Sequence, residues 1–315
     1  MAPAPVHVLA PHTMNRISVE VPASTSNLGP GFDVLGLALG LHLRVAAQPA
    51  DALAIDYHGA GPADAIPRDQ RNLVHRAIAV VYSRAGRALP PLHVAIDNPI
   101  PLHGGLGSSG AAAVAGVLLG CALSQLELSH DEQLQLACAL EGHPDNVSAS
   151  LYGGLTLSRR VGDRWVSFSP SIPDPPLAVI LHPKIEIPTQ KARALLPTSI
   201  PRAQAVENLA NTAALVAGLL SKPRRLSPDC FRDYLHQPAR RVLMPWFPQV
   251  VAAAVEAGAE GCFLSGSGPS ILAFTSPAKA PIIKSAMAKA MTAHTVPFDT
   301  LVLPTAVAPA RVVES

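Results

Sequence analysis

Residues 101–115 read PLHGGLGSSGAAAVA, a cluster of glycines that runs directly into alanines. Glycine has no Cβ, so it lets backbone N–H groups approach a ligand closely. The alanines favour a helix, and the unpaired N–H groups and dipole at a helix start attract anions. The pattern therefore predicts a phosphate-binding loop, in which Ser108 and Ser109 can bind a phosphate oxygen or Mg²⁺. A purely structural turn before a helix is the alternative.

Two common glycine loops fit these residues poorly. Gly105, Gly107 and Gly110 match the G-x-G-x-x-G pattern of dinucleotide-binding proteins, but that unit also needs a second strand ending in an acidic residue about 20 positions on. Here two helical patterns follow instead. A nucleoside-triphosphate P-loop and a protein kinase each need a nearby lysine, whereas the first lysine of the chain is Lys184. We therefore expect backbone and hydroxyl groups to hold the phosphate.

The composition indicates a globular, cytoplasmic protein. Of 315 residues, 49% are apolar and 15% are charged, which is typical of a chain with a sizeable core. The net charge of +2 provides no general field for nucleic acid or an anionic membrane. The longest apolar stretch, 111–123, is shorter than the roughly 18 residues that cross a bilayer. Four widely spaced cysteines favour reduced thiols, and the start of the chain does not resemble a signal peptide.

The elements that must position the loop follow from periodicity and turn residues. Predicted strands cover 16–21, 41–47, 52–58, 92–97, 155–160, 177–183 and 299–303, with a glycine-rich hairpin over 262–274. Predicted helices cover 72–86, 108–123, 130–142, 189–196, 202–220, 246–257 and 278–294, with a turn and short helix within 143–154. Because strands and helices mix without regular alternation, we expect an α+β fold. The predicted domains are a flexible tail over 1–15, an N-terminal domain over 16–168 and a C-terminal domain over 169–315, whose last strand can return to the first domain.

Three segments resemble the GHMP small-molecule kinases. PLHGGLGSSGAA resembles the P-x-x-x-G-L-G-S-S-x-A phosphate loop of this superfamily. VPASTSNLGPGFDVLGLAL (21–39) and GCFLSGSGPSILAF (261–274) lie where the superfamily has its other motifs. PASTSNLGPGFDVLG, EGHPDNVSASLYGGL, HPKIEIPTQKARALLP and QPARRVLMP resemble segments of the homoserine kinase family. The resemblance extends over nearly the whole chain after the tail.

The resemblance implies an activity and a fold. The activity is ATP-dependent phosphorylation of the side-chain hydroxyl of L-homoserine to O-phospho-L-homoserine, in threonine biosynthesis, with Mg²⁺ beside the ATP. The fold is an N-terminal α+β domain followed by a ferredoxin-like α+β domain. Members of the family are commonly dimeric, so the resemblance is compatible with a homodimer. Two alternatives stay open: a GHMP kinase acting on mevalonate or a sugar, and a nucleotide-binding module without catalysis.

The resemblance also implies roles for individual residues. The implied ATP-binding loop consists of Pro101, Leu102, His103, Gly104, Gly105, Leu106, Gly107, Ser108, Ser109, Gly110 and Ala111. The implied Mg²⁺ ligands are Ser109 and Glu141, and the implied catalytic residues are Asn146, Thr189 and Arg193. The implied substrate contacts are Asn27, Asp33, His143, Arg193 and Arg240. The hairpin over 266–270 is expected to pack on the phosphate loop.

The side-chain chemistry suits an amino acid substrate. Arg193 and Arg240 can each bind a carboxylate through two N–H donors. Asp33 is the single charge in GFDVLGLAL, where a carboxylate is costly unless it is paired. We expect Asp145 to cap the next helix and not to act as a general base, because Asp is favoured at helix starts. Phosphoryl transfer needs alignment and charge neutralisation more than a strong base.

Two positions depart from the family pattern. His103 stands where a small residue is usual, so it could crowd the loop or add a donor to a phosphate. Gln237 stands where Glu commonly precedes a proline. This change puts a secondary contact to the substrate ammonium or to an arginine in doubt.

Overall fold

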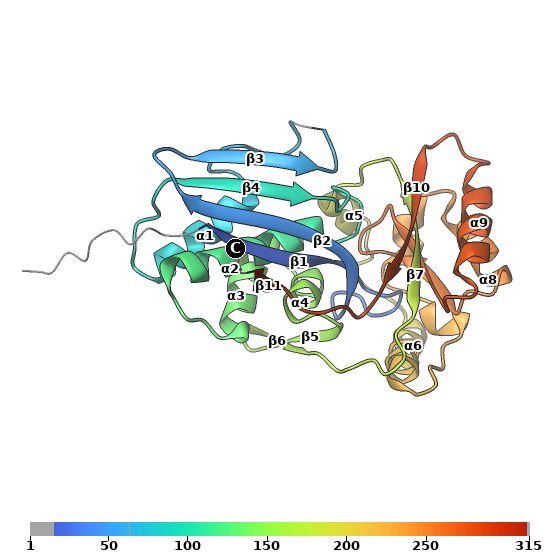
Figure 1. The fold of residues 1–315 in the computed structure, drawn as a ribbon. Helices are drawn as coiled ribbons and strands as arrows, with labels where there is room; N and C mark the ends of the chain where they lie inside the picture. The colour runs from blue at the N-terminus through green and yellow to red at the C-terminus, as the bar shows by residue number, and fades with distance from the viewer. Residues whose placement is uncertain (1–15, 63, 314–315) are drawn as a thin grey trace, which may run out of the picture.

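The computed structural model describes residues 16–62 and 64–313, and the predicted tail over 1–15 lies outside them. The chain folds around two β-sheets, one of seven strands and one of four (Figure 1). The larger sheet takes its strands from the first part of the chain and from its last strand, and the smaller sheet from the second part. Helices accompany both sheets, so the predicted α+β class is confirmed.

The larger sheet positions the N-terminal motifs. It consists of β1 (Ile17–Ser26), β2 (Leu35–Pro49), β3 (Ala54–Gly59), β4 (Leu92–Asn98), β5 (Leu155–Val161), β6 (Arg164–Phe168) and β11 (Arg311–Val313). The order is β11-β1-β2-β4-β3, while β5 pairs with the first residues of β2 and with β6. Only the β3–β4 pair is parallel among these strands.

Four helices lie against one face of the larger sheet (Figure 1): α1 (Leu73–Arg84), α2 (Ser108–Ser124), α3 (His130–Glu141) and α4 (Asp145–Tyr152). Helix α2 is apolar around most of its circumference and is largely buried. Its glycines let α1 pack closely, since a Cβ on Gly116 would lie 2.5 Å from the carbonyl oxygen of Val74. This packing fixes the start of α2, which directly follows the glycine loop.

The smaller sheet consists of β7 (Leu177–Pro183), β8 (Gly261–Leu264), β9 (Ile271–Thr275) and β10 (Phe298–Pro304), in the order β10-β7-β9-β8. Helices α8 (Phe247–Glu256) and α9 (Ala280–Met291) pack against it. The remaining helices are α5 (Thr189–Ala194), α6 (Arg202–Leu220) and α7 (Gln237–Arg240), with the 3-10 helices η1 (Pro228–Phe231) and η2 (Arg241–Leu243). Within residues 16–62 and 64–313, no helix is long and apolar enough to cross a membrane.

Two apolar clusters form the core. The first lies between the larger sheet and α1–α4, and it continues to Phe231, Phe263 and Phe274 beside the smaller sheet. The second lies between the smaller sheet and α8 and α9. Since the first cluster includes residues from both parts of the chain, burial of apolar surface holds the two parts together.

The strand pattern differs from the prediction in three places. The predicted strand 41–47 belongs to the longer β2, because residues 35–39 are also buried and paired. β6 and β11 were missed, since they are short and mostly exposed and have no buried apolar face. The last predicted strand, 299–303, is β10 and stays in the smaller sheet; β11 instead returns to pair with β1. The boundary between 168 and 169 stays a prediction.

Candidate active site

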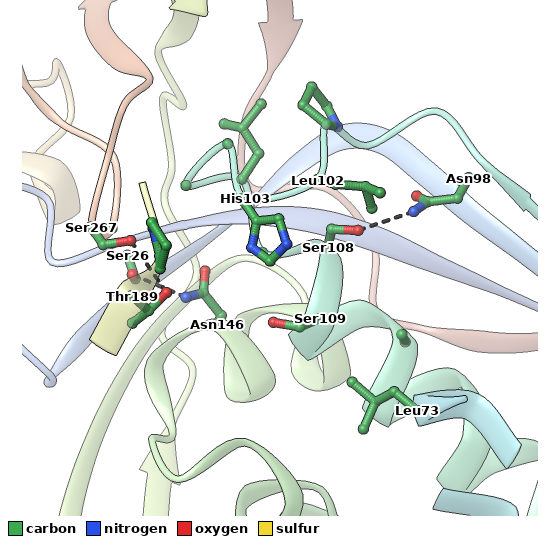
Figure 2. Close-up of a pocket in the computed structure, with 18 of the residues that line it drawn as sticks. Ser26, Leu73, Asn98, Leu102, His103, Ser108, Ser109, Asn146, Thr189 and Ser267 are labelled. Carbon is green, nitrogen blue, oxygen red and sulfur yellow. Dashed lines mark hydrogen bonds between the residues drawn. The ribbon is translucent and has the colours of Figure 1, made fainter. Parts of the chain in front are cut away.

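A cavity of about 490 Å³ lies between the glycine loop, the ends of β1 and β4, and helices of the second part of the chain. Figure 2 shows two different ends: Leu73 and Leu102 lie near one, and Ser26, Asn146, Thr189 and Ser267 near the other. A volume of this size is typical of a small-molecule site. The cavity therefore has an apolar end and a polar end.

The glycine loop lines the cavity through residues 101–109 without a gap. His103, Gly105 and Gly107 have left-handed φ angles of 52°, 75° and 73°. Because α2 begins at Ser108, the N–H groups of its first turn lack intrahelical acceptors at the end of the loop. Gly110 and Ala111, predicted as part of the ATP-binding loop, are buried in this turn and do not line the cavity.

Gly107 is required by the packing of the protein itself. A Cβ at this position would lie 2.2 Å from Ser24 Oγ and 3.0 Å from Asn146 Oδ1. The backbone N–H of Ser24 also donates to the carbonyl oxygen of Leu106 at 3.1 Å. The loop is thus in direct contact with β1 and α4, and a side chain at 107 would displace these neighbours as well as any phosphate.

The β8–β9 hairpin packs on the glycine loop, as predicted. Ser265 Oγ donates to the carbonyl oxygen of Gly105 at 2.6 Å, and the N–H of Ser270 donates to the carbonyl oxygen of Gly104 at 3.3 Å. Ser265 Oγ also lies 2.8 Å from Thr25 Oγ1 of β1. The hairpin therefore ties the loop to β1 from a second direction.

The apolar end of the cavity contains residues that the sequence analysis missed. Its lining includes Leu43, Tyr57, Ile66, Pro67, Asn72, Leu73, Val74, Ile96 and Asn98. Asn98 Nδ2 donates to Ser108 Oγ at 3.0 Å and to the Tyr57 hydroxyl at 3.4 Å, which anchors the first residue of α2 (Figure 2). These residues come from separate strands and loops and from the start of α1, and they share no motif, so no local signal marked them.

Asn146 of α4 is held by two serines of β1. Ser24 Oγ donates to Asn146 Oδ1 at 3.0 Å. Asn146 Nδ2 donates to Ser26 Oγ at 3.1 Å, and Figure 2 shows this second bond. These two bonds fix which way the amide faces. One amide hydrogen and one lone pair of Oδ1 remain for a ligand in the cavity.

Asp145 and His143 form a hydrogen-bonded pair in the cavity wall. One carboxylate oxygen of Asp145 accepts from His143 Nδ1 at 2.9 Å and from the N–H of Asn146 at 2.8 Å. Burial opposes charge on Asp145, but the bond with His143 and its charge lower the pKa of Asp145. Burial also opposes charge on His143, but its bond to Asp145 raises the pKa of His143. The expected cap is not formed: Pro144 is the N-cap of α4, and Asp145 is its first residue.

Ser109 and Glu141 are in direct contact. Ser109 Oγ donates to Glu141 Oε2 at 2.7 Å, and burial raises the pKa of Glu141. Ser109 lines the cavity, whereas Glu141, the last residue of α3, does not. Within the described ranges, no group of three His, Cys, Asp or Glu side chains could hold a metal ion. A single carboxylate with a hydroxyl fits an ion that takes its other ligands from phosphates and water.

Arg193 and Asp33 join the two parts of the chain at the polar end. Arg193 Nη1 and Nη2 donate to the two oxygens of Asp33 at 2.8 and 2.9 Å. The N–H of Asp33 donates to Asn27 Oδ1, and Asn27 Nδ2 donates to the carbonyl oxygen of Gly266, both at 3.0 Å. Arg193, Asp33 and Asn27 all line the cavity, as does Thr189, whose Oγ1 lies 3.4 Å from Ser267 Oγ.

Arg240 also lines the cavity, but it lacks a carboxylate partner. The residue is 2% exposed; its Nη1 donates to the carbonyl oxygen of Gly266 at 2.9 Å and contacts His236 Nδ1 at 3.0 Å. Its Nε has no hydrogen-bond partner, and no described carboxylate forms an ion pair with it. Burial and the charge of Arg193 lower the pKa of Arg240 to about 10. A buried cation of this kind is costly by itself and favours an anionic ligand.

The two departures from the family pattern have different surroundings. His103 is exposed and lines the cavity (Figure 2). Its backbone is left-handed, with a φ of 52°. Gln237 does not line the cavity: its Nε2 donates to the carbonyl oxygen of Phe231 at 3.3 Å, and its Oε1 accepts from the N–H of Leu264 at 2.9 Å. Gln237 therefore stabilises the fold behind Arg240.

Two families of known proteins match the chain. The GHMP kinases N terminal domain matches residues 72–154, and the GHMP kinases C terminal family matches residues 211–293. The first range contains the glycine loop and Asn146, and the second contains Arg240 and the β8–β9 hairpin. The two matches thus contain part of the cavity lining, whereas Asn27, Asp33 and Arg193 lie outside the matched ranges.

Individual relatives extend over nearly the whole chain. A homoserine kinase from Synechocystis sp. is 38% identical over 91% of this chain and 97% of its own length. A homoserine kinase from Carboxydothermus hydrogenoformans is 40% identical over 84% of this chain and 86% of its own length. The crystal structure of homoserine kinase from Cytophaga hutchinsonii has a TM-score of 0.84 and 34% identity, covering 97% of this chain and all of that chain.

More distant structures share the fold alone. The mevalonate kinase of L. major, solved with R-mevalonate, has a TM-score of 0.63 and 18% identity over 93% of this chain and 95% of that chain. At this identity the likeness concerns architecture and not substrate. The residues at the polar end must therefore explain the choice of substrate.

Proposed function

This chain belongs to the homoserine kinase family of the GHMP kinases, and on that premise we propose how its cavity phosphorylates the side-chain hydroxyl of L-homoserine. The product is O-phospho-L-homoserine, an intermediate of threonine biosynthesis. The observation that carries the proposal is buried Arg240, which forms no ion pair with a carboxylate of residues 16–62 or 64–313 and lies beside the Asp33–Arg193 pair. This arrangement offers cations and an anion together to one ligand.

The polar end suits the zwitterionic head of homoserine. The substrate carboxylate binds Arg240 and Arg193, and the substrate ammonium binds Asp33 and Asn27. Asp33 and Arg193 neutralise each other in the structure. A zwitterion replaces each of these charges with one of the same sign, so it can enter without leaving either partner uncompensated. A neutral substrate would have to separate the pair without such compensation.

The glycine loop and the apolar end suit ATP. The nucleoside lies at the end lined by Leu73, Leu102 and Tyr57, and the phosphates lie along the loop toward Asn146. The loop offers backbone N–H groups and the start of α2, which together attract phosphate oxygens. In this proposal Thr189 and Arg193 of α5, which both line the cavity, contact the γ-phosphate.

Ser109 and Glu141 are the residues that would hold Mg²⁺. A carboxylate and a hydroxyl in direct contact match the oxygen ligands that this ion prefers, and phosphate oxygens would complete its shell. The ion would neutralise charge on the transferring phosphate. Its binding would also favour the ionised form of Glu141, whose pKa is raised by burial.

The reaction proceeds by alignment. Asn146, fixed by Ser24 and Ser26, orients the hydroxyl of homoserine toward the γ-phosphate. The hydroxyl oxygen forms a bond to phosphorus as the bond from phosphorus to the leaving ADP oxygen breaks, and the hydroxyl proton is released. Asp145 takes no proton in this proposal, because its bond with His143 lowers the pKa of the buried carboxylate and so makes it a weaker base. The pair instead stabilises the start of α4.

An assay of ADP release with homoserine, mevalonate and galactose tests the reaction and its substrate. Activity with homoserine alone is expected. Activity with mevalonate or galactose would indicate another GHMP kinase, and ATP binding without turnover of any of the three would indicate a nucleotide-binding module.

Arg240→Ala tests the carboxylate contact. Loss of a hydrogen bond between charged groups is typically about 1.5–3 kcal/mol, so KM for homoserine should rise about 10- to 150-fold while KM for ATP changes little. Arg241→Ala is the matched control, since Arg241 is the next residue, is exposed and does not line the cavity. Equal changes in both KM values would contradict the assignment of Arg240.

A further inference from the structure

One aromatic ring supports both arginines of the polar end. The guanidinium carbons of Arg193 and Arg240 each lie 5.4 Å from the ring centroid of Phe32. Arg193 comes from α5, Arg240 from α7, and Phe32 from the loop between β1 and β2. Phe32 is half-buried and does not line the cavity. It therefore lies behind the two cations and not against the substrate.

A π face is chemically suited to this position. It attracts a cation through its quadrupole but accepts none of the N–H bonds that the cation needs for a ligand. A carboxylate in the same place would neutralise the arginines and compete with the substrate carboxylate. Phe32 thus stabilises two neighbouring cations without accepting a hydrogen bond from either of them.

His236 supports the same arrangement through contacts with both Arg240 and Phe32. Its ring stacks on Phe32 with centroids 5.4 Å apart and an interplanar angle of 28°. His236 is fully buried, and its Nε2 lies 2.8 Å from the carbonyl oxygen of Gly29, so Nε2 donates there and Nδ1 accepts from Arg240. Burial lowers the pKa of His236 to about 4, even though Asp233 lies nearby. Arg240 is therefore held by a neutral acceptor and a π face, neither of which cancels its charge.

We propose that Phe32 is a positioning residue for substrate recognition: with His236 behind it, its ring holds Arg193 and Arg240 in place for the carboxylate of homoserine. The proposal rests on the function proposed above, in which these arginines bind that carboxylate. Removing the ring should loosen the arginines, lowering affinity for a carboxylate-bearing substrate specifically.

Phe32→Leu and Phe32→Tyr test the proposal as a pair, because tyrosine keeps the π face and leucine does not. KM for homoserine should rise about 3- to 30-fold in the leucine variant, the range expected for cation–π contacts. In the tyrosine variant KM for homoserine should stay within about threefold of the wild type. In the leucine variant KM for ATP should rise by a smaller factor than KM for homoserine, because only Arg193 of the two arginines is proposed to contact ATP. If Phe32→Leu does not fold, Phe32→Met takes its place in the same comparison.

Homoserine amide, which lacks the carboxylate, separates positioning from general damage. Phe32→Leu should raise KM for homoserine but leave KM for the amide nearly unchanged. The effect on homoserine should also shrink in an Arg240→Ala background, because residues that act together are not additive. The proposal would be overturned if Phe32→Leu raised KM for homoserine and KM for its amide equally. It would also be overturned if Phe32→Leu raised KM for homoserine by the same factor with and without Arg240→Ala. If Arg240→Ala alone leaves KM for homoserine unchanged, the carboxylate contact itself is wrong, which is a separate outcome.

Discussion

At the scale of single residues, the polar end of the cavity contains two buried charges with opposite surroundings. Asp145 has local partners of its own, since one of its oxygens accepts from both His143 and Asn146 and its bond with His143 also forms an ion pair when the imidazole is protonated. Arg240 is equally buried but has only neutral acceptors. A satisfied charge has a structural role, whereas an unsatisfied charge at a cavity wall has capacity left for a ligand. This difference separates Asp145 from the substrate-binding residues.

The same reasoning predicts the effect of changing Asp145. Asp145→Asn keeps the size of the side chain and an acceptor for His143, so kcat should stay within about tenfold of the wild type, or roughly 1.4 kcal/mol of disturbed alignment. Asn146→Ala should lower kcat further, because it removes the amide that Ser24 and Ser26 hold in place. Steady-state kinetics with saturating ATP and homoserine compares the two variants.

A general base typically contributes 10²- to 10⁴-fold in rate. If Asp145→Asn were thousands of times slower while both substrates still bound, Asp145 would be the proton acceptor and the mechanism without a base would be wrong. Thermal unfolding of the variant is the control, since its buried pair with His143 also stabilises α4.

At the scale of elements, the glycine loop depends on four neighbouring elements and not on its own sequence alone. β1 contacts it through Ser24, α4 through Asn146, the β8–β9 hairpin through Ser265, and β4 through Asn98. Each contact requires close backbone approach or a polar side chain at a fixed position. A conformational change in any of these elements is therefore expected to alter phosphate binding.

Gly107→Ala tests this dependence. The new Cβ would meet Ser24 Oγ at 2.2 Å on a backbone with φ 73°, so the loop must shift. We expect the Kd for ATP to rise more than about tenfold, and the bulkier Gly107→Val to abolish ATP binding, while far-UV circular dichroism remains that of a folded protein. Isothermal titration calorimetry measures the Kd.

Gly86→Ala is the matched control for Gly107→Ala. Gly86 has a similar φ of 65°, but a Cβ there meets nothing within 4 Å. It should therefore lose roughly 1–2 kcal/mol of stability from the left-handed backbone alone, with ATP affinity unchanged. An unchanged Kd in folded Gly107→Ala would mean that the loop tolerates the side chain and that its close packing is not needed for binding.

At the scale of the whole molecule, the end of the chain returns to support the catalytic half. The N–H of Ala306 donates to the carbonyl oxygen of Ala38, and the N–H of Gly154 donates to the carbonyl oxygen of Val307. The N–H of Ala310 donates to the carbonyl oxygen of Ser150 of α4. β11 then pairs with β1. Because α4 carries Asn146 and β1 carries the serines that hold it, the last residues brace the site from outside.

Two truncations should separate these contacts. Ending the chain at residue 310 removes β11 and should lower the free energy of unfolding by about 1 kcal/mol with kcat unchanged. Ending it at residue 305 also removes the contacts to α4, so we expect a loss of roughly 3 kcal/mol and a lower kcat. Urea unfolding and steady-state kinetics measure both effects.

Glu20→Gln is the control for the truncations, because it breaks the ion pairs of Glu20 with Arg44 and Arg311 but keeps β11. Such partly exposed pairs typically contribute no more than about 1 kcal/mol. If the truncation at 305 left kcat unchanged, the returning segment would stabilise the fold without bracing the site.

Residues whose roles depend on local backbone chemistry were predictable before the fold was known. The glycines and serines of 104–109, and the absence of a lysine before Lys184, indicated a phosphate loop made of backbone and hydroxyl groups. The motifs around Asp33, Asn146, Arg193 and Arg240 indicated the substrate side, and all four residues line the same cavity. These signals are readable because each lies within a short contiguous segment.

The contacts that these residues make, in contrast, depend on how distant elements pack. The Asp33–Arg193 pair spans 160 positions of the chain, and the apolar end combines Tyr57, Leu73 and Asn98 from separate elements. The sequence also gave no sign that one phenyl ring, Phe32, lies under two arginines. Contacts of this kind depend on the packing of elements that are distant along the chain, which no local pattern of residue types records.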